Sequence, residues 1–338
     1  MTPRTQTVLI GHTSVEQTIL RSWQRGCLHH AMIFVGPKGV GKATCAFRLA
    51  RFLLSPEREN DQLGISATSP VFCRIASGGH GDLLVIEPNP ELASKEINID
   101  RVRPIRRFLS QTSMEGGWRI VIIDGAMNRN AANALLKSLE EPPKNTLIII
   151  IADALGNLSP TIRSRCIQYA FSPIDATEAK SVIQTLYPEL DKEQLNGVIA
   201  LCGGRPGYVT TLKESNAVSL YQHLLESLVS LKASSLETVI PFCQKYSAKP
   251  KKSETVDSWW LVGELFAMIM QRLILAAREQ LVLPVYPAER EHLGALLTWR
   301  SLPEWAVVLG KVTQSYAAGR ISHLDRFQVL LGAMASVS

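Results

Sequence analysis

The sequence lacks the features of a membrane or secreted protein. No apolar run in its 338 residues reaches the ~18 residues of a membrane span. Residues 1–7 are polar and lack the apolar core of a signal peptide. The longest apolar stretch, 261–281, is interrupted by Glu264, Gln271 and Arg272, which favours a packed or subunit-interface helix. We therefore expect a cytoplasmic protein without a membrane anchor.

Cysteine is sparse and scattered. The six cysteines lie at positions 27, 45, 73, 166, 202 and 243, and no two have the spacing of a metal clip. This excludes a zinc finger or ribbon and predicts buried thiols rather than a disulfide framework.

The sequence also lacks a strong excess of positive or negative charge. The chain has 36 Lys and Arg against 30 Asp and Glu, a net charge of +6, and only 20% of its residues are charged. This balance argues against wholesale disorder and does not by itself indicate a polyanion partner. With 46% hydrophobic residues, a chain of this length predicts two or three domains with cores of their own.

Strand-like and helical runs alternate in the first half of the sequence. Continuous apolar runs predict buried strands at 31–35, 83–86, 120–124, 147–152 and 167–171. Helical patterns lie between them at 42–54, 100–111 with Asp100 as N-cap, and 130–141. This alternation is typical of an α/β fold with a parallel sheet.

After Pro173 the pattern becomes helical, first at 177–186, 194–201 and 207–214 and then to the end of the chain. The sequence thus predicts an α/β P-loop domain at 1–172, a small helical lid domain at 173–214 and an all-α collar domain for oligomerisation at 215–338.

A glycine-rich segment follows the first predicted strand. It reads Gly-Pro-Lys-Gly-Val-Gly-Lys-Ala-Thr over positions 36–44 and opens a predicted helix. Glycines at 36, 39 and 41 let the backbone N–H groups turn around a phosphate, to which the helix N-terminus adds its dipole. Lys42 would reach the outer phosphates of ATP. A glycine-rich turn without a nucleotide is the alternative.

One position of this P-loop departs from the usual motif. The residue after the lysine is normally Ser or Thr, whose hydroxyl binds Mg²⁺, and here it is Ala43. Thr44 is displaced by about 100° around the helix axis and is a poor substitute. We expect nucleotide binding at residues 36–44 to tolerate this change better than metal-assisted hydrolysis does.

The strand at 120–124 ends in Asp124, which has the form of a Walker B carboxylate that holds Mg²⁺ through water. Ring-forming ATPases follow this Asp with a Glu that polarises the attacking water, whereas this chain continues with Gly125. Loss of such a group slows hydrolysis by ~10²–10⁴-fold. Ala43 and Gly125 together predict a chain that does not hydrolyse ATP itself.

The order of motifs resembles the clamp-loader branch of the AAA+ proteins, and most of all the delta-prime type of bacterial DNA polymerase III subunits. The motifs are GPKGVGK, RIVIID, NRNAANALLKSLEEPP and PTIRSRC. The resemblance runs from about Gly11 to Arg326 and is dense between residues 30 and 172.

This resemblance implies a role for Arg165. The triplet Ser164-Arg165-Cys166 matches the clamp-loader SRC motif, whose arginine acts in trans on the ATP of the neighbouring subunit. Arg163 is a weaker candidate for the same role, and an ordinary surface arginine at position 165 is the alternative.

The chain also departs from the family. Many members carry a four-cysteine zinc module where this sequence has only Cys73 between residues 55 and 81, so we expect no zinc. In the lid region, Tyr208 stands where delta-prime subunits have an arginine, and Arg205 lies close by. These losses fit a subunit whose own ATP site is degenerate.

The resemblance further implies partners: a gamma/tau motor subunit, a delta subunit, the backbone of primer–template DNA and, indirectly, the sliding clamp. Four arginines at 101, 103, 106 and 107 could contact DNA phosphates, but so many in one short helix cannot share one face. A solvated or subunit-contacting surface is the alternative. The lysines between 245 and 252 are similarly open between a phosphate contact and a solvated loop.

Three functions remain to be compared. The first is a trans-acting clamp-loader subunit, helping ATP-driven loading of the sliding clamp at replication forks, with its own ATP hydrolysis lost. The second is an ATP-hydrolysing motor subunit of the gamma/tau type, which the intact P-loop glycines and Lys42 favour. The third, a stand-alone P-loop kinase or DNA-binding module, leaves the SRC element unexplained.

Overall fold

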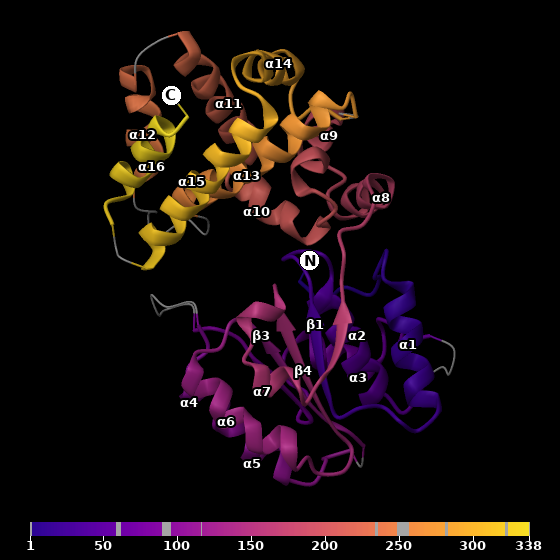
Figure 1. Ribbon diagram of the computed structural model, residues 1–338. Coiled ribbons are helices and arrows are strands. Elements are labelled where there is room, and N and C mark those ends of the chain that lie inside the picture. Colours follow the sequence, from indigo (N-terminus) through magenta and orange to yellow (C-terminus); the bar gives the residue numbers. More distant parts are fainter. Residues whose placement is uncertain are drawn as a thin grey trace. The chain divides into compact units, whose positions relative to one another are not determined.

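The computed structural model describes residues 2–58, 62–89, 96–115, 117–233, 236–248, 257–280, 283–321 and 324–337. The chain forms two compact units (Figure 1). Unit 1 holds residues 1–182 together with 204–207, and unit 2 holds 183–203 and 208–338. The division into a lid at 173–214 and a collar at 215–338 stays a prediction.

Unit 1 is built on a five-stranded parallel sheet in the order β2-β3-β4-β1-β5. The strands are β1 (Ala31–Val35), β2 (Leu83–Ile86), β3 (Arg119–Asp124), β4 (Thr146–Ala152) and β5 (Ile167–Ala170). All five predicted strands are confirmed to within a residue at either end. The central strand β4 is buried along its whole length, as expected for a strand covered on both faces.

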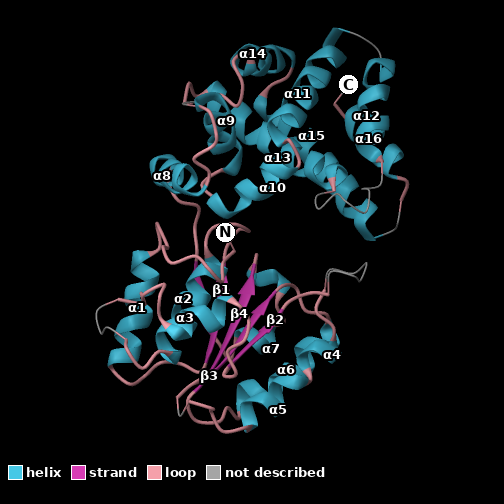
Figure 2. Ribbon diagram, turned by 180° about the vertical axis from the view of Figure 1, so that it is seen from behind, coloured by secondary structure: helices cyan, strands magenta, loops and turns pink. Residues whose placement is uncertain are grey.

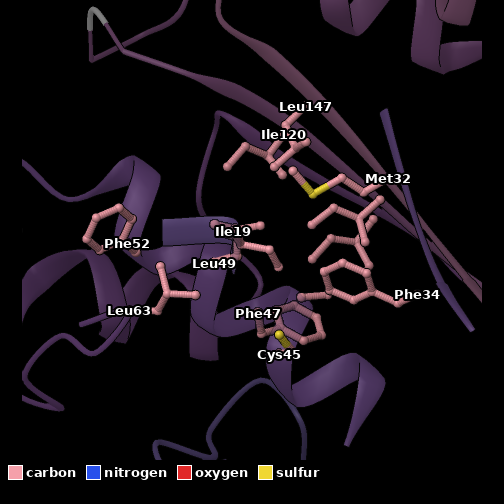
Figure 3. Packing of buried hydrophobic residues seen from close by; sticks show 14 of the residues in the cluster. Ile19, Met32, Phe34, Cys45, Phe47, Leu49, Phe52, Leu63, Ile120 and Leu147 are labelled. Carbon is pink, nitrogen blue, oxygen red and sulfur yellow. The ribbon is translucent and has the colours of Figure 1, made fainter. Parts of the chain in front are cut away.

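Two hydrophobic clusters cover the two faces of this sheet. Figure 3 shows part of the first, in which Phe47, Leu49 and Phe52 of α2 pack on alternate residues of the strands such as Phe34. The second cluster uses the intervening strand residues, among them Ile33, against the helices on the opposite face. Because side chains alternate along a strand, each strand contributes to both clusters.

Unit 1 has helices on both faces of the sheet (Figure 2). They are α1 (Thr13–Gln24), α2 (Lys42–Leu54), α3 (Pro70–Ala76), α4 (Ile99–Val102), α5 (Pro104–Ser110), α6 (Arg129–Glu140) and α7 (Pro160–Arg163). A 3₁₀ turn, η1, lies at Leu155–Asn157. Helix α8 (Ala176–Leu186) contains the boundary between the units.

The single helix expected at 100–111 is wrong, because the segment forms the two short helices α4 and α5. Pro104 has no backbone N–H to continue the first helix and instead occupies the first position of the second. The N-cap is Asn98, not Asp100: its side chain accepts a hydrogen bond of 3.2 Å from the Arg101 N–H.

The described part of unit 2 is helical (Figure 2). Its helices are α9 (Lys192–Cys202), α10 (Val209–Glu214), α11 (Ala217–Ala233), α12 (Ile240–Ser247), α13 (Ser258–Ala277), α14 (Glu289–Trp299), α15 (Leu302–Ile321) and α16 (Arg326–Ala335). The 3₁₀ turns η2 (Pro206–Tyr208) and η3 (Leu236–Val239) precede α10 and α12. The helix expected at 207–214 therefore begins as η2.

A buried ion pair lies in the core of unit 2. Glu289 is fully buried, and its carboxylate accepts hydrogen bonds from the Arg272 guanidinium, at 2.6 Å from Nη2, and from the Tyr221 hydroxyl at 2.7 Å. The Val285 N–H donates to the same carboxylate at 2.7 Å. Arg272 is itself only 7% exposed, so each charge depends on the other for its solvation.

Among the described helices, α13 is long and apolar enough to cross a membrane. It packs against α11, α14 and α15, and it carries the buried Arg272. These contacts account for its hydrophobicity as that of a core helix, in line with the interpretation made from the sequence.

The expectation that all six cysteines are buried is partly wrong. Cys45, Cys202 and Cys243 are buried and Cys166 is half-buried, whereas Cys27 and Cys73 are exposed. None of these six described cysteines forms a disulfide bond. Within the described residues no cluster of His, Cys, Asp or Glu could hold a metal ion. Because residues 59–61 of the region expected to lack zinc lie outside that part, the zinc prediction is not tested.

Candidate functional site

The candidate site lies at the carboxyl ends of the strands, the edge at which open α/β sheets bind ligands. The P-loop follows β1, Asp124 is the last residue of β3, and Asp153 directly follows β4 between them. The register places Val35 beside Ala152, and Asp124 beside Ile151. The sheet therefore brings the predicted loop and the predicted carboxylate together and adds a second carboxylate, Asp153.

Two glycines of the P-loop are required by its surroundings. A side chain at Gly36 would place its Cβ 2.0 Å from the Phe171 carbonyl oxygen. Gly41 has a φ of 111°, and a Cβ there would lie 2.8 Å from Leu9. The loop is thus fixed against the rest of unit 1 in a backbone conformation that other residues rarely adopt.

Contacts from outside hold the carbonyl groups of the P-loop. The Val40 carbonyl lies 2.8 Å from Nε2 of the buried His12, and the Gly39 carbonyl accepts a hydrogen bond of 2.9 Å from the Gly207 N–H. Within the described residues, no protein group accepts a hydrogen bond from the backbone N–H groups of residues 39–43. This arrangement fits a phosphate, because the backbone N–H donors remain available while the carbonyl acceptors already have partners.

Lys42 is only 5% exposed and does not extend into solvent. Its ammonium donates to the Gly36 carbonyl, to the Pro37 carbonyl at 2.9 Å, and to Oδ1 of Asp153 at 2.9 Å. Asp153 by contrast is 62% exposed. The cation predicted to bind the outer phosphates is therefore bonded within the protein.

Asp124 is half-buried at the end of β3. Burial is the main reason that the pKa of its carboxyl is raised, and the negative charge of Glu87 raises it further, whereas Lys42 opposes the shift. Glu87 follows β2 and is exposed, with its carboxylate 3.2 Å from the guanidinium of Arg4. The sheet edge thus carries three carboxylates, of which Glu87 is paired with Arg4 and Asp153 with Lys42.

The structure shows a further obstacle to an acid after Asp124. Gly125 has a φ of 143°, and a Cβ at this position would lie 2.8 Å from Cγ of Pro88. A glutamate could not be accommodated there without movement of the chain.

At the P-loop, Ala43 packs its methyl group against the hydrophobic core, and Thr44 is half-buried one position further along α2.

Arg165 lies at the other edge of the sheet. It follows α7 and precedes β5, whereas the P-loop follows β1, and β1 and β5 are neighbouring parallel strands. Ile167, two residues after Arg165, pairs with Met32 near the start of β1, so Arg165 lies near the amino ends of the strands, whereas the P-loop lies at their carboxyl ends. Arg165 therefore does not form part of the P-loop site of its own chain.

Three contacts orient the Arg165 side chain, which is 36% exposed. Nη2 lies 2.6 Å from Oε1 of Glu140 at the end of α6. Nη1 donates to the Thr161 carbonyl at 3.0 Å and to the Ser164 hydroxyl at 3.4 Å. The neighbouring Arg163 is half-buried, and its Nε has no hydrogen-bond partner within the described residues. The guanidinium of Arg165 is thus held at the surface and oriented.

The other candidate residues are divided between the two units. Arg205 belongs to unit 1, next to the Gly207 that contacts the P-loop, whereas Tyr208 is buried in unit 2 and donates to Glu264. Lys245 lies over the ring of Tyr246. The lysines at 249, 251 and 252 lie outside the described residues.

The four clustered arginines all point away from the core. Those at 101, 103, 106 and 107 are exposed, whereas Val102, Ile105 and Leu109 of the same segment are buried. One of them, Arg103, pairs with Asp100 at 3.1 Å. The expectation that they cannot share one face of a single helix does not apply, because the segment is two helices.

Sequence reasoning missed Asp153, Gly207 and His12. A signal existed for Asp153, since it is an acid directly after a continuous apolar strand, as Asp124 is at the end of another. No comparable signal marks Gly207 or His12, because their contacts with the P-loop span many residues of chain and arise only from the tertiary fold.

Comparisons with known proteins show a similarity to subunits of DNA polymerase III. Residues 11–175 match the family model described as DNA polymerase III, delta subunit. The delta-prime subunit of Pseudomonas aeruginosa is 38% identical over 179 residues, or 52% of this chain and 53% of the relative. That of Bacillus subtilis is 32% identical over 180 residues, with the same coverage. The tau subunit of Escherichia coli is 28% identical over 55% of this chain and 28% of its own length.

Similarity to solved structures is weaker. A gamma-subunit-related protein from Thermotoga maritima has 19% identity and a TM-score of 0.37, covering 94% of this chain and 98% of that one. A variant of RuvB from the same organism has 15% identity and a TM-score of 0.40, with 82% and 80% covered. The chain spans about half the length of the delta-prime relatives named above. Residues 11–175 are thus similar to the DNA polymerase III delta-subunit family that the model describes, and delta-prime subunits are among the relatives that they match.

Proposed function

We propose that the protein is a delta-prime-type subunit of a bacterial clamp loader, which completes the ATP site of a neighbouring subunit through Arg165. One observation carries this proposal. The guanidinium pairs with Glu140 near the amino ends of the strands, at the sheet edge opposite the P-loop. An oriented arginine at that edge is suited to act on a nucleotide held by another subunit, where it would stabilise charge on the transferred phosphate.

We propose further that the chain's own ATP hydrolysis is lost, and its own site supports this. Ala43 supplies no hydroxyl for Mg²⁺, and Gly125 supplies no acid. The glycine's φ and the Pro88 ring also leave no room for an acid at that position. When bound, Mg²⁺ would neutralise phosphate charge, and Asp124 is the residue at this edge placed to hold it through water.

The similarity of residues 11–175 to this family supports a set of partners. They are a gamma/tau motor subunit and a delta subunit, with the sliding clamp reached through the assembly. The exposed arginines of α4 and α5 are suited to the phosphate backbone of primer–template DNA, and we expect no reading of base sequence. The helices of 173–214 and 215–338 would serve as lid and collar. Such a protein works in the cytoplasm at replication forks.

A motor subunit of the gamma/tau type is the second candidate. The P-loop glycines, Lys42 and the unoccupied N–H donors of residues 39–43 favour it, as does the 28% identity to a tau subunit. Robust Mg²⁺-dependent ATP turnover by the purified chain alone would support this candidate and contradict the loss of hydrolysis.

The decisive experiment is reconstitution with gamma/tau and delta subunits, with DNA-stimulated ATP turnover as the readout. Arg165→Ala should leave assembly intact and lower turnover at the completed site, where an arginine of this kind contributes roughly 10³-fold. Arg25→Ala removes an exposed arginine beyond the end of α1 and serves as the matched control. Unchanged turnover with Arg165→Ala in an intact complex would refute the role in trans.

A further inference from the structure

We propose that Asp153 takes the place of an outer phosphate beside Lys42 and thereby keeps this chain's own P-loop closed to ATP. This concerns the loop of the chain itself and is independent of the action of Arg165 on a neighbour. It assigns a function to a carboxylate that lies outside the P-loop and outside the strand of Asp124.

The hydrogen bonds of Lys42 carry the inference. An ammonium group has three N–H donors. In this protein, all three have acceptors: the carbonyls of Gly36 and Pro37, and Oδ1 of Asp153. Two of these acceptors are part of the loop itself, and the third comes from the end of β4. No donor of Lys42 is left for a phosphate oxygen until one of the three bonds is broken.

Asp153 is the acceptor that a phosphate would replace. The two carbonyls are neutral and belong to the backbone of the P-loop. Asp153 is negatively charged, and its side chain is 62% exposed. A triphosphate that displaced the Asp153 carboxylate from Lys42 would still lie close to that carboxylate. The nucleotide would therefore lose part of the attraction of the cation and gain repulsion from the displaced carboxylate.

The neighbouring charges act in the same direction. Glu87 and Asp124 lie at the same edge as Asp153, and the carboxyl pKa of Asp124 is raised first by burial and then by these two negative neighbours. Lys42 and Lys38 oppose the charge on Asp124, and Arg4 is paired with Glu87. With Lys42 paired to Asp153 and Arg4 paired to Glu87, both of these cations are already bound within the protein before a polyanion arrives.

The rest of the P-loop already has a conformation that can bind phosphate, so Asp153 alone would account for the exclusion of ATP. The backbone donors of residues 39–43 have no acceptors among the described residues. His12 and Gly207 hold the carbonyls of Val40 and Gly39 from outside. Neutralising Asp153 should therefore release Lys42 while leaving the phosphate-binding backbone in place.

The test is ATP binding to the full-length chain by isothermal titration calorimetry, with and without Mg²⁺. Asp153→Asn keeps the shape and the carbonyl acceptor but removes the charge, and we expect it to raise ATP affinity at least about tenfold. Glu87→Gln is the matched control, because it removes one carboxylate of the same edge that makes no bond to Lys42; we expect a change of less than about threefold. Adding Lys42→Ala to Asp153→Asn should abolish the gain.

Three results would overturn the inference. An unchanged affinity in Asp153→Asn, including undetectable binding in every variant, would show that Asp153 does not close the loop. A weaker affinity would make the carboxylate a ligand of the nucleotide or of its metal. An equal gain in affinity from Glu87→Gln would show that the effect comes from the total charge at this edge and not from the bond between Asp153 and Lys42. Because binding is measured on the chain alone, none of these outcomes bears on Arg165, which is tested by turnover in the reconstituted complex.

Discussion

The buried Arg272–Glu289 pair allows a sharp prediction about the stability of unit 2. Glu289→Ala removes the acceptor of the Arg272 guanidinium, the Tyr221 hydroxyl and the Val285 N–H at once. Breaking one partner of a buried pair costs about 3–5 kcal/mol, because the other charge stays buried without compensation. For a unit of this size, the loss lowers the unfolding temperature by roughly 10 °C.

Urea unfolding followed by tryptophan fluorescence is a suitable assay, because four of the six tryptophans, at 259, 260, 299 and 305, belong to unit 2. Glu304→Ala is the control: among the described residues this exposed glutamate accepts only from the N–H and the hydroxyl of Ser301, and its loss should change stability by less than about 1 kcal/mol. Glu289→Leu combined with Arg272→Met should recover most of the loss, because a hydrophobic replacement of similar volume buries no charge. A loss below ~1 kcal/mol in Glu289→Ala, or no recovery in the double variant, would refute the reasoning.

Three further predictions follow from unit 1. Gly125→Glu combined with Ala43→Ser should not restore ATP hydrolysis and should destabilise the chain by about 2 kcal/mol. The reason is that a side chain at position 125 would contact Pro88 and would have an unfavourable φ. ATP turnover above that of the wild type in a well-folded variant would contradict this. Burial lowers the pKa of His80 and His30, so the unfolded state binds more protons as pH falls through about 6.5, and the free energy of unfolding should decrease from pH 7.5 to 5.5. His80→Asn should flatten that urea-unfolding profile, and an unaltered slope would exclude His80 as a source. Ellman's reagent should modify the exposed Cys27 and Cys73 rapidly but Cys166, whose pKa burial raises to about 11, slowly; fast labelling of more than two thiols would show that the core opens.

Local patterns determined the secondary structure of unit 1 well and failed where proline intervened. The strands were predictable because continuous Ile, Val and Leu runs form strands only where both faces are covered. The break at Pro104 was readable from the sequence, since proline ends a hydrogen-bonding pattern, but helical periodicity at Val102, Ile105 and Leu109 obscured it.

The candidate site shows the same division. Gly36, Lys42, Ala43 and Asp124 could be found from the sequence, because a P-loop and a strand-ending carboxylate are local motifs. The bond from Lys42 to Asp153 joins residues 111 positions apart and depends on β4 lying beside β1, which no local pattern encodes.

The sequence by itself determined the α/β class, the position of the P-loop and the absence of the hydroxyl and acid on which hydrolysis depends. Only the tertiary structure decided which groups meet. Parallel pairing of β1 with β4 and β5 puts the P-loop beside Asp153 at one sheet edge and Arg165 at the other. The physical reason is that strand order and direction are set by burial of the whole core, whereas a motif records only its own residues.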